Sequence, residues 1–147
     1  METIQLSVII NASPWKIWTV LTEKELIRQW AGAFAEGTWL DTTWQPGTPA
    51  LWYTAQGDVS VQGEIGVFEP PLHIRISYEG DTPPGSVPPG TEPYTENFYI
   101  EENEKEARLR ISAGPLSDDD VSKHESLWQE ALKRIKEICE QQSGLTS

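Results

Sequence analysis

Glu96 is the residue in this sequence with the clearest potential for chemistry, because the residues that alternate with it are apolar. In the predicted strand 94–101, Glu96 shares one face with Phe98 and Ile100, at the period of two that a strand imposes. If Phe98 points inward, Glu96 lies in or near an apolar site, where its pKa rises and it suits a general base or a hydrogen-bond anchor. In the alternative interpretation, Glu96 lies at the mouth of the strand and reaches solvent.

Other catalytic chemistries find little support in the sequence. His73 is expected on the outer face of a strand and His124 near the start of a helix, so these two distant histidines do not form a metal site. Cys139 falls on an apolar helical stripe, which favours packing over nucleophilic chemistry. We find no nucleophile-elbow motif and no phosphate-binding glycine loop. No metal or cofactor is expected, and the identity of any catalytic residue stays unknown.

Composition indicates one domain over residues 1–147 and excludes several partners. The chain has 23 acidic and 11 basic residues and a net charge of -12, which opposes binding to nucleic acid and to anionic membrane surfaces. We find no signal peptide and no apolar run of membrane-spanning length, so we expect a cytoplasmic protein. The single cysteine excludes an intramolecular disulfide.

The first thirty residues predict a strand followed by two short helices. Residues 3–10 alternate in the pattern of a half-buried strand. Ser13 is suited to cap a helix whose first residue is Pro14. A second helix is predicted over 23–30, with Thr22 as its candidate cap.

The remainder of the chain predicts six strands and one long helix. The helix is expected to begin at the cap Ser117, to carry acidic residues 118–120 in its first turn and to end near Gln142. Segment 81–93 is rich in proline and is interpreted either as a surface loop or as a gate to a pocket. The strands, which turn residues separate, are predicted over 38–44, 50–55, 58–68, 72–78, 94–101 and 107–113.

Three ordered blocks resemble the START-like (SRPBCC) superfamily, and within it the branch of homologues of the activator of the heat-shock-protein-90 ATPase, which is related to polyketide cyclases. Block 12–30 begins with Ala-Ser-Pro and contains Trp18 and Trp30, block 63–71 reads Gly-Glu-Ile-Gly-Val-Phe-Glu-Pro-Pro, and block 127–136 reads Leu-Trp-x-x-x-Leu-x-x-Ile-Lys. The resemblance implies an α+β helix-grip fold, a curved antiparallel sheet wrapped around the C-terminal helix. This fold hosts carriers, cyclases, hydrolases and co-chaperones, so it does not fix a function.

Strand alternation sorts the predicted sheet into two faces. An outer face is expected for Ser60, Gln62, His73, Arg75, Arg108 and Arg110. Gly63 and Gly66 indicate a β-bulge, which makes the register beyond Gly63 ambiguous. The inner face is expected to carry Val59, Val61, Ile65, Val67, Ile74, Ile76, Tyr78, Leu109 and Ile111.

A concave sheet and a straight helix cannot touch everywhere, so we expect an enclosed, mainly apolar cavity between them. The leading hypothesis is a protein that binds a small apolar or amphipathic molecule there. The alternatives are a cyclase or isomerase with Glu96 as base and Tyr78 or Tyr53 as oxyanion donor, or a module that stimulates a chaperone or another protein through its surface. The predicted cavity residues are Trp18, Trp30, Tyr53, Val61, Ile76, Tyr78, Glu96, Phe98, Leu109, Trp128 and Leu132.

Overall fold

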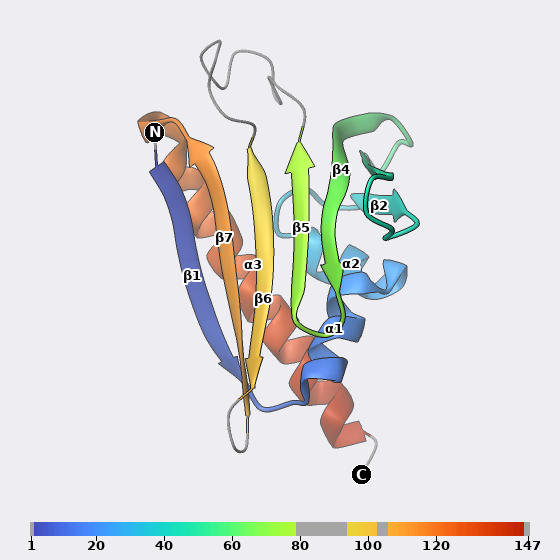
Figure 1. Cartoon of the computed structure of the whole chain (residues 1–147), viewed down its shortest axis with the longest axis vertical. Coiled ribbons are helices and arrows are strands. Elements are labelled where there is room, and N and C mark those ends of the chain that lie inside the picture. The colour runs from blue at the N-terminus through green and yellow to red at the C-terminus, as the bar shows by residue number, and fades with distance from the viewer. Residues whose placement is uncertain (1, 79–93, 103–105, 146–147) are drawn as a thin grey trace.

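A seven-stranded antiparallel sheet crosses in front of one long helix (Figure 1). We describe a computed structural model of the chain over residues 2–78, 94–102 and 106–145. The strands follow the spatial order β1-β7-β6-β5-β4-β3-β2, and every neighbouring pair is antiparallel. This arrangement confirms the predicted α+β helix-grip fold. The strands are β1 (Glu2–Ile10), β2 (Trp39–Thr42), β3 (Pro49–Tyr53), β4 (Val59–Glu69), β5 (His73–Tyr78), β6 (Thr95–Glu102) and β7 (Ala107–Leu116).

Two short helices, α1 (Pro14–Thr22) and α2 (Lys24–Ala31), follow β1 as predicted. The Ser13 hydroxyl accepts a hydrogen bond from the Lys16 backbone N–H at 3.2 Å, which satisfies a donor at the start of α1. The prediction that Thr22 caps α2 is wrong: Glu23 occupies the cap, and the Thr22 hydroxyl donates to the Trp18 carbonyl within α1. Thr22 is still helical, so its side chain bonds back one turn instead of forward.

A β-bulge in β4 changes which of its residues face inward. Ile65 pairs with Ile76, but Val67 and Phe68 then pair with Arg75 and Ile74, so the register shifts at Gly66. The prediction that Val67 points inward is therefore wrong, because the extra residue brings Phe68 onto the inner face instead. Phe68 packs there against Trp18, with ring centroids 5.0 Å apart.

A second register shift lies at the start of β4. Trp52 pairs with Val61 and Tyr53 with Val59, which leaves Ser60 as the extra residue. Val59 is 51% exposed and not inward as predicted. The predicted inner residues further along the sheet, such as Ile74, Leu109 and Ile111, are buried.

The long helix α3 (Asp118–Leu145) packs against β1, α1 and α2. At its start, the Ser117 hydroxyl donates to the Asp120 carboxylate at 2.8 Å. Near its end, the Lys136 ammonium donates to the Ile9 carbonyl at 2.8 Å, and the Glu140 carboxylate accepts from the Asn11 backbone N–H at 2.9 Å. These bonds fix the helix to the end of β1.

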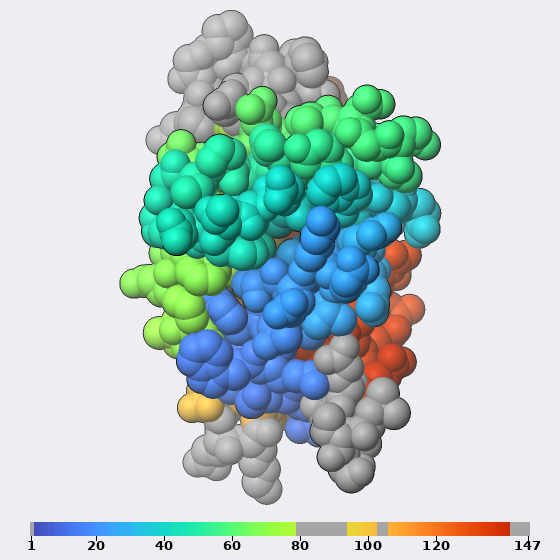
Figure 2. All heavy atoms as spheres, turned by 90° about the vertical axis from the view of Figure 1, so that its right-hand side faces the viewer, coloured from blue at the N-terminus to red at the C-terminus, as the bar shows by residue number. Residues whose placement is uncertain are grey.

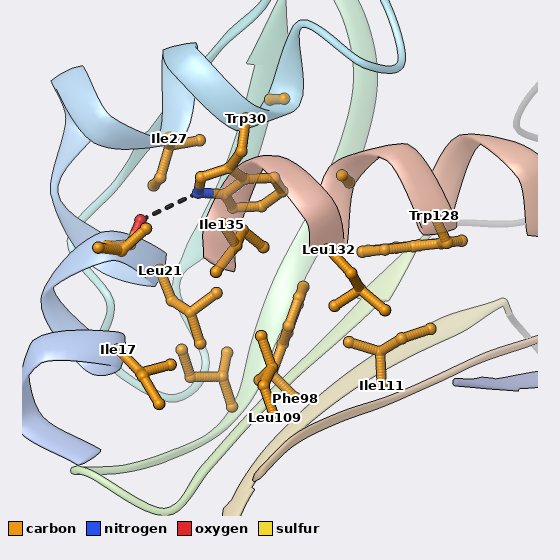
Figure 3. Packing of buried hydrophobic residues seen from close by; sticks show 14 of the residues in the cluster. Ile17, Leu21, Ile27, Trp30, Phe98, Leu109, Ile111, Trp128, Leu132 and Ile135 are labelled. Atoms are coloured by element: carbon orange, nitrogen blue, oxygen red, sulfur yellow. Dashed lines mark hydrogen bonds between the residues drawn. The ribbon is translucent and has the colours of Figure 1, made fainter. Parts of the chain in front are cut away.

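The core lies between α3, the two short helices and the inner face of the sheet. Figure 3 shows Ile17, Leu21 and Trp30 from the short helices meeting side chains of the sheet and of α3. The Trp30 indole N–H donates to the Val20 carbonyl at 3.0 Å, which joins α2 to α1. Seen from the side of these two helices, α1 and α2 in blue lie directly below the β2–β3 region in teal (Figure 2). The cysteine predicted to pack, Cys139, is fully buried, and burial raises the pKa of its thiol to about 12.

Trp128 is predicted to be an anchor of this core. Its side chain is 1% exposed and meets Phe34 and Phe98 at ring-centroid distances of 4.9 and 5.7 Å. Because Trp→Ala in a core leaves a large cavity, Trp128→Ala should lower the free energy of unfolding by about 3–5 kcal/mol in urea denaturation. Trp15→Ala, at a site that is 59% exposed, is the matched control and should cost less than about 1 kcal/mol. Equal losses in the two variants would contradict the anchor role.

Candidate functional site

A cavity of about 330 Å³ lies between α2, the start of α3 and the inner face of β3–β6. This volume is at the lower end of the range of small-molecule sites. Its wall is dominated by aromatic rings and contains one carboxylate. The lining residues are Trp30, Ala31, Phe34, Ala35, Thr38, Trp52, Ser60, Val61, Tyr78, Tyr94, Glu96, His124 and Trp128.

A chain of hydrogen bonds across three strands converges on Glu96. The Trp52 indole N–H on β3 donates to the Tyr78 hydroxyl on β5 at 3.0 Å, and that hydroxyl donates to Glu96 Oε1 at 3.0 Å. The Tyr94 hydroxyl, just before β6, donates to Glu96 Oε2 at 2.8 Å. Each carboxylate oxygen therefore accepts one tyrosine hydroxyl, and the side chain is held in a single orientation.

The surroundings of Glu96 change its acidity. Burial raises its pKa from 4.5 to about 7, while the hydrogen bonds from Tyr94 and Tyr78 act in the opposite direction because they stabilise the charged form. Glu96 as a residue is only half-buried, and it lines the cavity. Glu96 is therefore a carboxyl group that exchanges its proton near neutral pH.

The two tyrosines respond to the same burial and to the carboxylate beside them. Burial first, and then the charge of Glu96, raise the pKa of the Tyr78 hydroxyl well above its usual range, and the Trp52 N–H lowers it by less. The pKa of Tyr94 is raised for the same two reasons. Both hydroxyls therefore stay protonated and act as donors to Glu96.

Trp128 presents a buried N–H next to this group. The indole N–H lies near enough to the Tyr94 hydroxyl to lower its pKa, but no acceptor among the described residues meets hydrogen-bond geometry.

The remaining polar side chains of the wall are either uncharged or already donate hydrogen bonds to the backbone. Burial lowers the pKa of His124, so its imidazole is neutral at neutral pH; Asp120 opposes this effect and Lys123 adds to it. The Thr38 hydroxyl donates to the Tyr53 carbonyl at 2.8 Å, and the Ser60 hydroxyl to the Trp52 carbonyl at 3.3 Å. Over residues 2–78, 94–102 and 106–145, no group of three His, Cys, Asp or Glu side chains is arranged to hold a metal ion.

The structure brings five of the predicted cavity residues together in the wall: Trp30, Val61, Tyr78, Glu96 and Trp128. Ser60, expected on the outer face, also reaches the cavity because it is the extra residue of the first bulge. The proline-rich segment 81–93, interpreted as a loop or a gate, lies outside the described residues.

The other six predicted residues do not line the cavity. Tyr53 stacks on Trp39 with centroids 4.2 Å apart, because alternation along β3 gives the inner position to Trp52. Phe98 packs edge-on between Trp30 and Trp128, where side chains fill the space between the sheet and the helices. The remaining four belong to the same solid core: Trp18, Ile76, Leu109 and Leu132.

The sequence carried signals for some of the residues that were missed. Tyr94 lies two positions before Glu96, so strand alternation places both on one face. His124 lies four positions before Trp128, one helical turn away on the same side. To predict that Trp52 lines the cavity, the register of β3 would have to be known. Nothing in the sequence indicated that Phe34 and Ala35, between α2 and β2, reach the wall.

Fold and cavity together define a helix-grip protein of the START-like superfamily. The chain belongs to the family described as activator of Hsp90 ATPase homolog 1-like protein, which matches residues 11–140. No curated protein matches the sequence.

Several solved structures share the fold at low sequence identity. Protein MLL2253 from Mesorhizobium loti is 16% identical, with a TM-score of 0.73 over 95% of this chain and 98% of that one. The Aha1 dimer from Colwellia psychrerythraea is 17% identical, with a TM-score of 0.71 over 92% and 94%. DynU16, a putative protein in the dynemicin biosynthetic locus, is 14% identical, with a TM-score of 0.74 over 95% of this chain and 48% of that one. At these identities the likeness establishes the fold alone.

The ionisation of Glu96 should make the folded protein less stable as pH rises. Its carboxyl titrates near 4.5 when unfolded and at about 7 when folded, so between these values the folded state binds more protons and stability falls with pH. At about 1.36 kcal/mol per pH unit, the loss approaches about 3 kcal/mol. In urea denaturation, the stability of wild type relative to Glu96→Gln should fall by this amount between about pH 4 and about pH 8. A difference that stays constant with pH would contradict the assignment.

Gly63 on β4 leaves the space that Tyr78 occupies. A Cβ there would lie 2.8 Å from the Ser77 carbonyl oxygen and 2.8 Å from the Tyr78 ring, whereas a Cβ at Gly66 would meet nothing closer than 3.4 Å. Gly63→Ala should therefore displace Tyr78 and cost about 1–3 kcal/mol in urea denaturation, and Gly66→Ala should cost less. The chemical shifts of Tyr94 should move only in Gly63→Ala, and an undisturbed Tyr94 would show that Tyr78 had kept its place.

Proposed function

We propose that this protein binds a small, largely apolar molecule in the cavity between α3 and the sheet. The observation that carries the proposal is the wall itself: aromatic rings surround an empty space, and one carboxylate is held in a fixed orientation among them. Sites of this type gain affinity from apolar contact and use a few polar groups to orient the ligand. The family assignment supports the proposal only at the level of the fold.

One observation favours a second function, that of a cyclase- or isomerase-type enzyme. Glu96 has a pKa of about 7, which suits a general base at neutral pH. Such a reaction also needs a donor for the developing oxyanion. Tyr78 already donates to Glu96, and Tyr53 lies outside the cavity, so neither predicted donor is available as placed. Binding without chemistry is therefore the better supported function.

The third hypothesis, a surface module that stimulates a chaperone ATPase, draws support from the family description and from the likeness to an Aha1 protein. A cavity too small for a ligand would favour this hypothesis over ligand binding. The volume of about 330 Å³ is instead within the range of ligand sites. Over the described residues, none of the helices has the length and apolar character needed to span a bilayer.

An apolar fluorescent probe such as a naphthalene derivative should bind the folded protein, and filling the cavity should prevent it. Val61 lines the cavity, so the larger side chain in Val61→Phe should occupy space that the probe needs. The dissociation constant should rise by about tenfold or more, which corresponds to a loss of about 1.4 kcal/mol of binding free energy. Fluorescence titration measures the dissociation constants.

Val59→Phe is the matched control, because it makes the same change two residues earlier on β4 at an exposed position outside the wall. It should bind the probe like wild type. Circular dichroism and thermal melts check that both variants fold. Absence of binding to wild type, or equal weakening in both variants, would overturn the ligand-binding function.

A further inference from the structure

The polar groups facing the cavity differ in what they can still offer a ligand. The hydroxyls of Thr38 and Ser60 and the indole N–H of Trp52 all donate to protein acceptors. Both tyrosine hydroxyls donate to Glu96. The Trp128 N–H is buried and inaccessible. Apart from the neutral His124, the wall therefore offers no free accessible donor among the described residues.

Glu96, by contrast, has acceptor capacity left. A carboxylate has about four lone-pair sites, and the two tyrosines occupy one on each oxygen. Glu96 also lines the cavity, from which a ligand would displace much of the water. Leaving the charge of a carboxylate uncompensated in such a place costs free energy, so a fitting ligand brings a positive charge, to which an N–H group adds a hydrogen bond.

The aromatic wall favours the same sign of charge. Six rings line the cavity, and the face of each carries negative electrostatic potential that attracts an organic cation. Among the described residues, no lysine or arginine lines the wall, so no fixed positive charge opposes a cation there. The protein's net charge of -12 adds a long-range field that attracts cations as well. The rings that line the cavity are Trp30, Phe34, Trp52, Tyr78, Tyr94 and Trp128.

We infer that the ligand of this cavity is an amphipathic organic cation, an apolar or aromatic body that carries an ammonium group paired with Glu96. The inference rests on the proposed binding function and names the chemical class of its ligand. The ammonium would lie against the free edge of the carboxylate, with the tyrosines holding the other side, and the apolar body would fill the space toward Phe34 and Val61.

The test compares probes that share a naphthalene body and differ in charge. The probes are 1-naphthylmethylammonium, the neutral 1-naphthalenemethanol, the anionic 1-naphthoate and the permanently charged (1-naphthylmethyl)trimethylammonium. In wild-type protein at about pH 8, the two cations should bind about tenfold more tightly than the alcohol, and naphthoate most weakly. Glu96→Gln should abolish the preference for cations while retaining the alcohol.

Glu101→Gln is the matched control, because it removes one carboxylate from β6 at an exposed position paired with Arg110. It removes the same single negative charge from the protein but should keep the preference for cations. This variant separates the contact with Glu96 from the overall field of the protein.

The permanently charged probe also makes the pH dependence interpretable, because only the protein titrates. Tyr78 from β5 and Tyr94 before β6 are the titratable groups bonded to Glu96, and His124 from α3 lines the same cavity. With a Glu96 pKa of about 7, affinity for this probe should rise on the order of tenfold from about pH 5.5 to about pH 8. Glu96→Gln retains His124, so the pH dependence that it loses belongs to Glu96.

The outcomes separate this inference from the function on which it rests. If the alcohol or naphthoate binds wild type as tightly as the cations, the cation inference is overturned while ligand binding stands. A preference for cations that persists in Glu96→Gln would overturn the inference in the same way. If no probe binds wild type, the ligand-binding function itself fails.

Discussion

The contact of Trp128 with Phe34 and Phe98 sets how closely α3 can approach the sheet. Three rings that meet edge-on at centroid distances of 4.9 and 5.7 Å cannot be compressed, because protein interiors are already close-packed. On one side of Trp128, Leu132 and Ile135 fill the space between helix and sheet as a solid core. On its other side, Trp128 lines the cavity. Trp128 is thus the boundary between the part of the molecule that is packed and the part that is hollow.

Polar side chains that line the cavity are largely shielded from water, and their hydrogen-bond partners come from the sheet. Trp52, Tyr78, Glu96 and Tyr94 come from or adjoin β3, β5 and β6, and their hydrogen bonds run across the strands. Because each group satisfies the next, the network is rigid, and a single acceptor is left for a ligand. The two bulges of β4 contribute to this arrangement: one brings Ser60 to the wall, and the other brings Phe68 into the core.

Hydrophobic periodicity, together with turn and cap residues, was sufficient to predict every strand, both short helices and α3, because each element buries one regular face and ends at such residues. It failed where regularity is broken. Val67 was assigned inward because the position of the bulge in β4 could not be read from a sequence with glycines at both 63 and 66. The predicted cavity extends further along the inner face of the sheet than the observed one. Phe98 and Leu109 point inward as expected, yet ring packing around Trp128 fills the space that they face. Which inward residues touch empty space depends on packing between distant elements, and local pattern does not encode it.

The buried thiol has a consequence for observing this molecule in motion. Cys139 lies on α3 with no exposed surface, and its thiol, with a pKa of about 12, holds almost no reactive thiolate while it stays enclosed. It is the sole cysteine of the chain. Reaction with a thiol reagent therefore requires the helix to separate locally from its surroundings, and the reaction rate counts those separations. The rate at which a thiol reagent modifies Cys139 therefore measures how often α3, the helix that closes the cavity, opens.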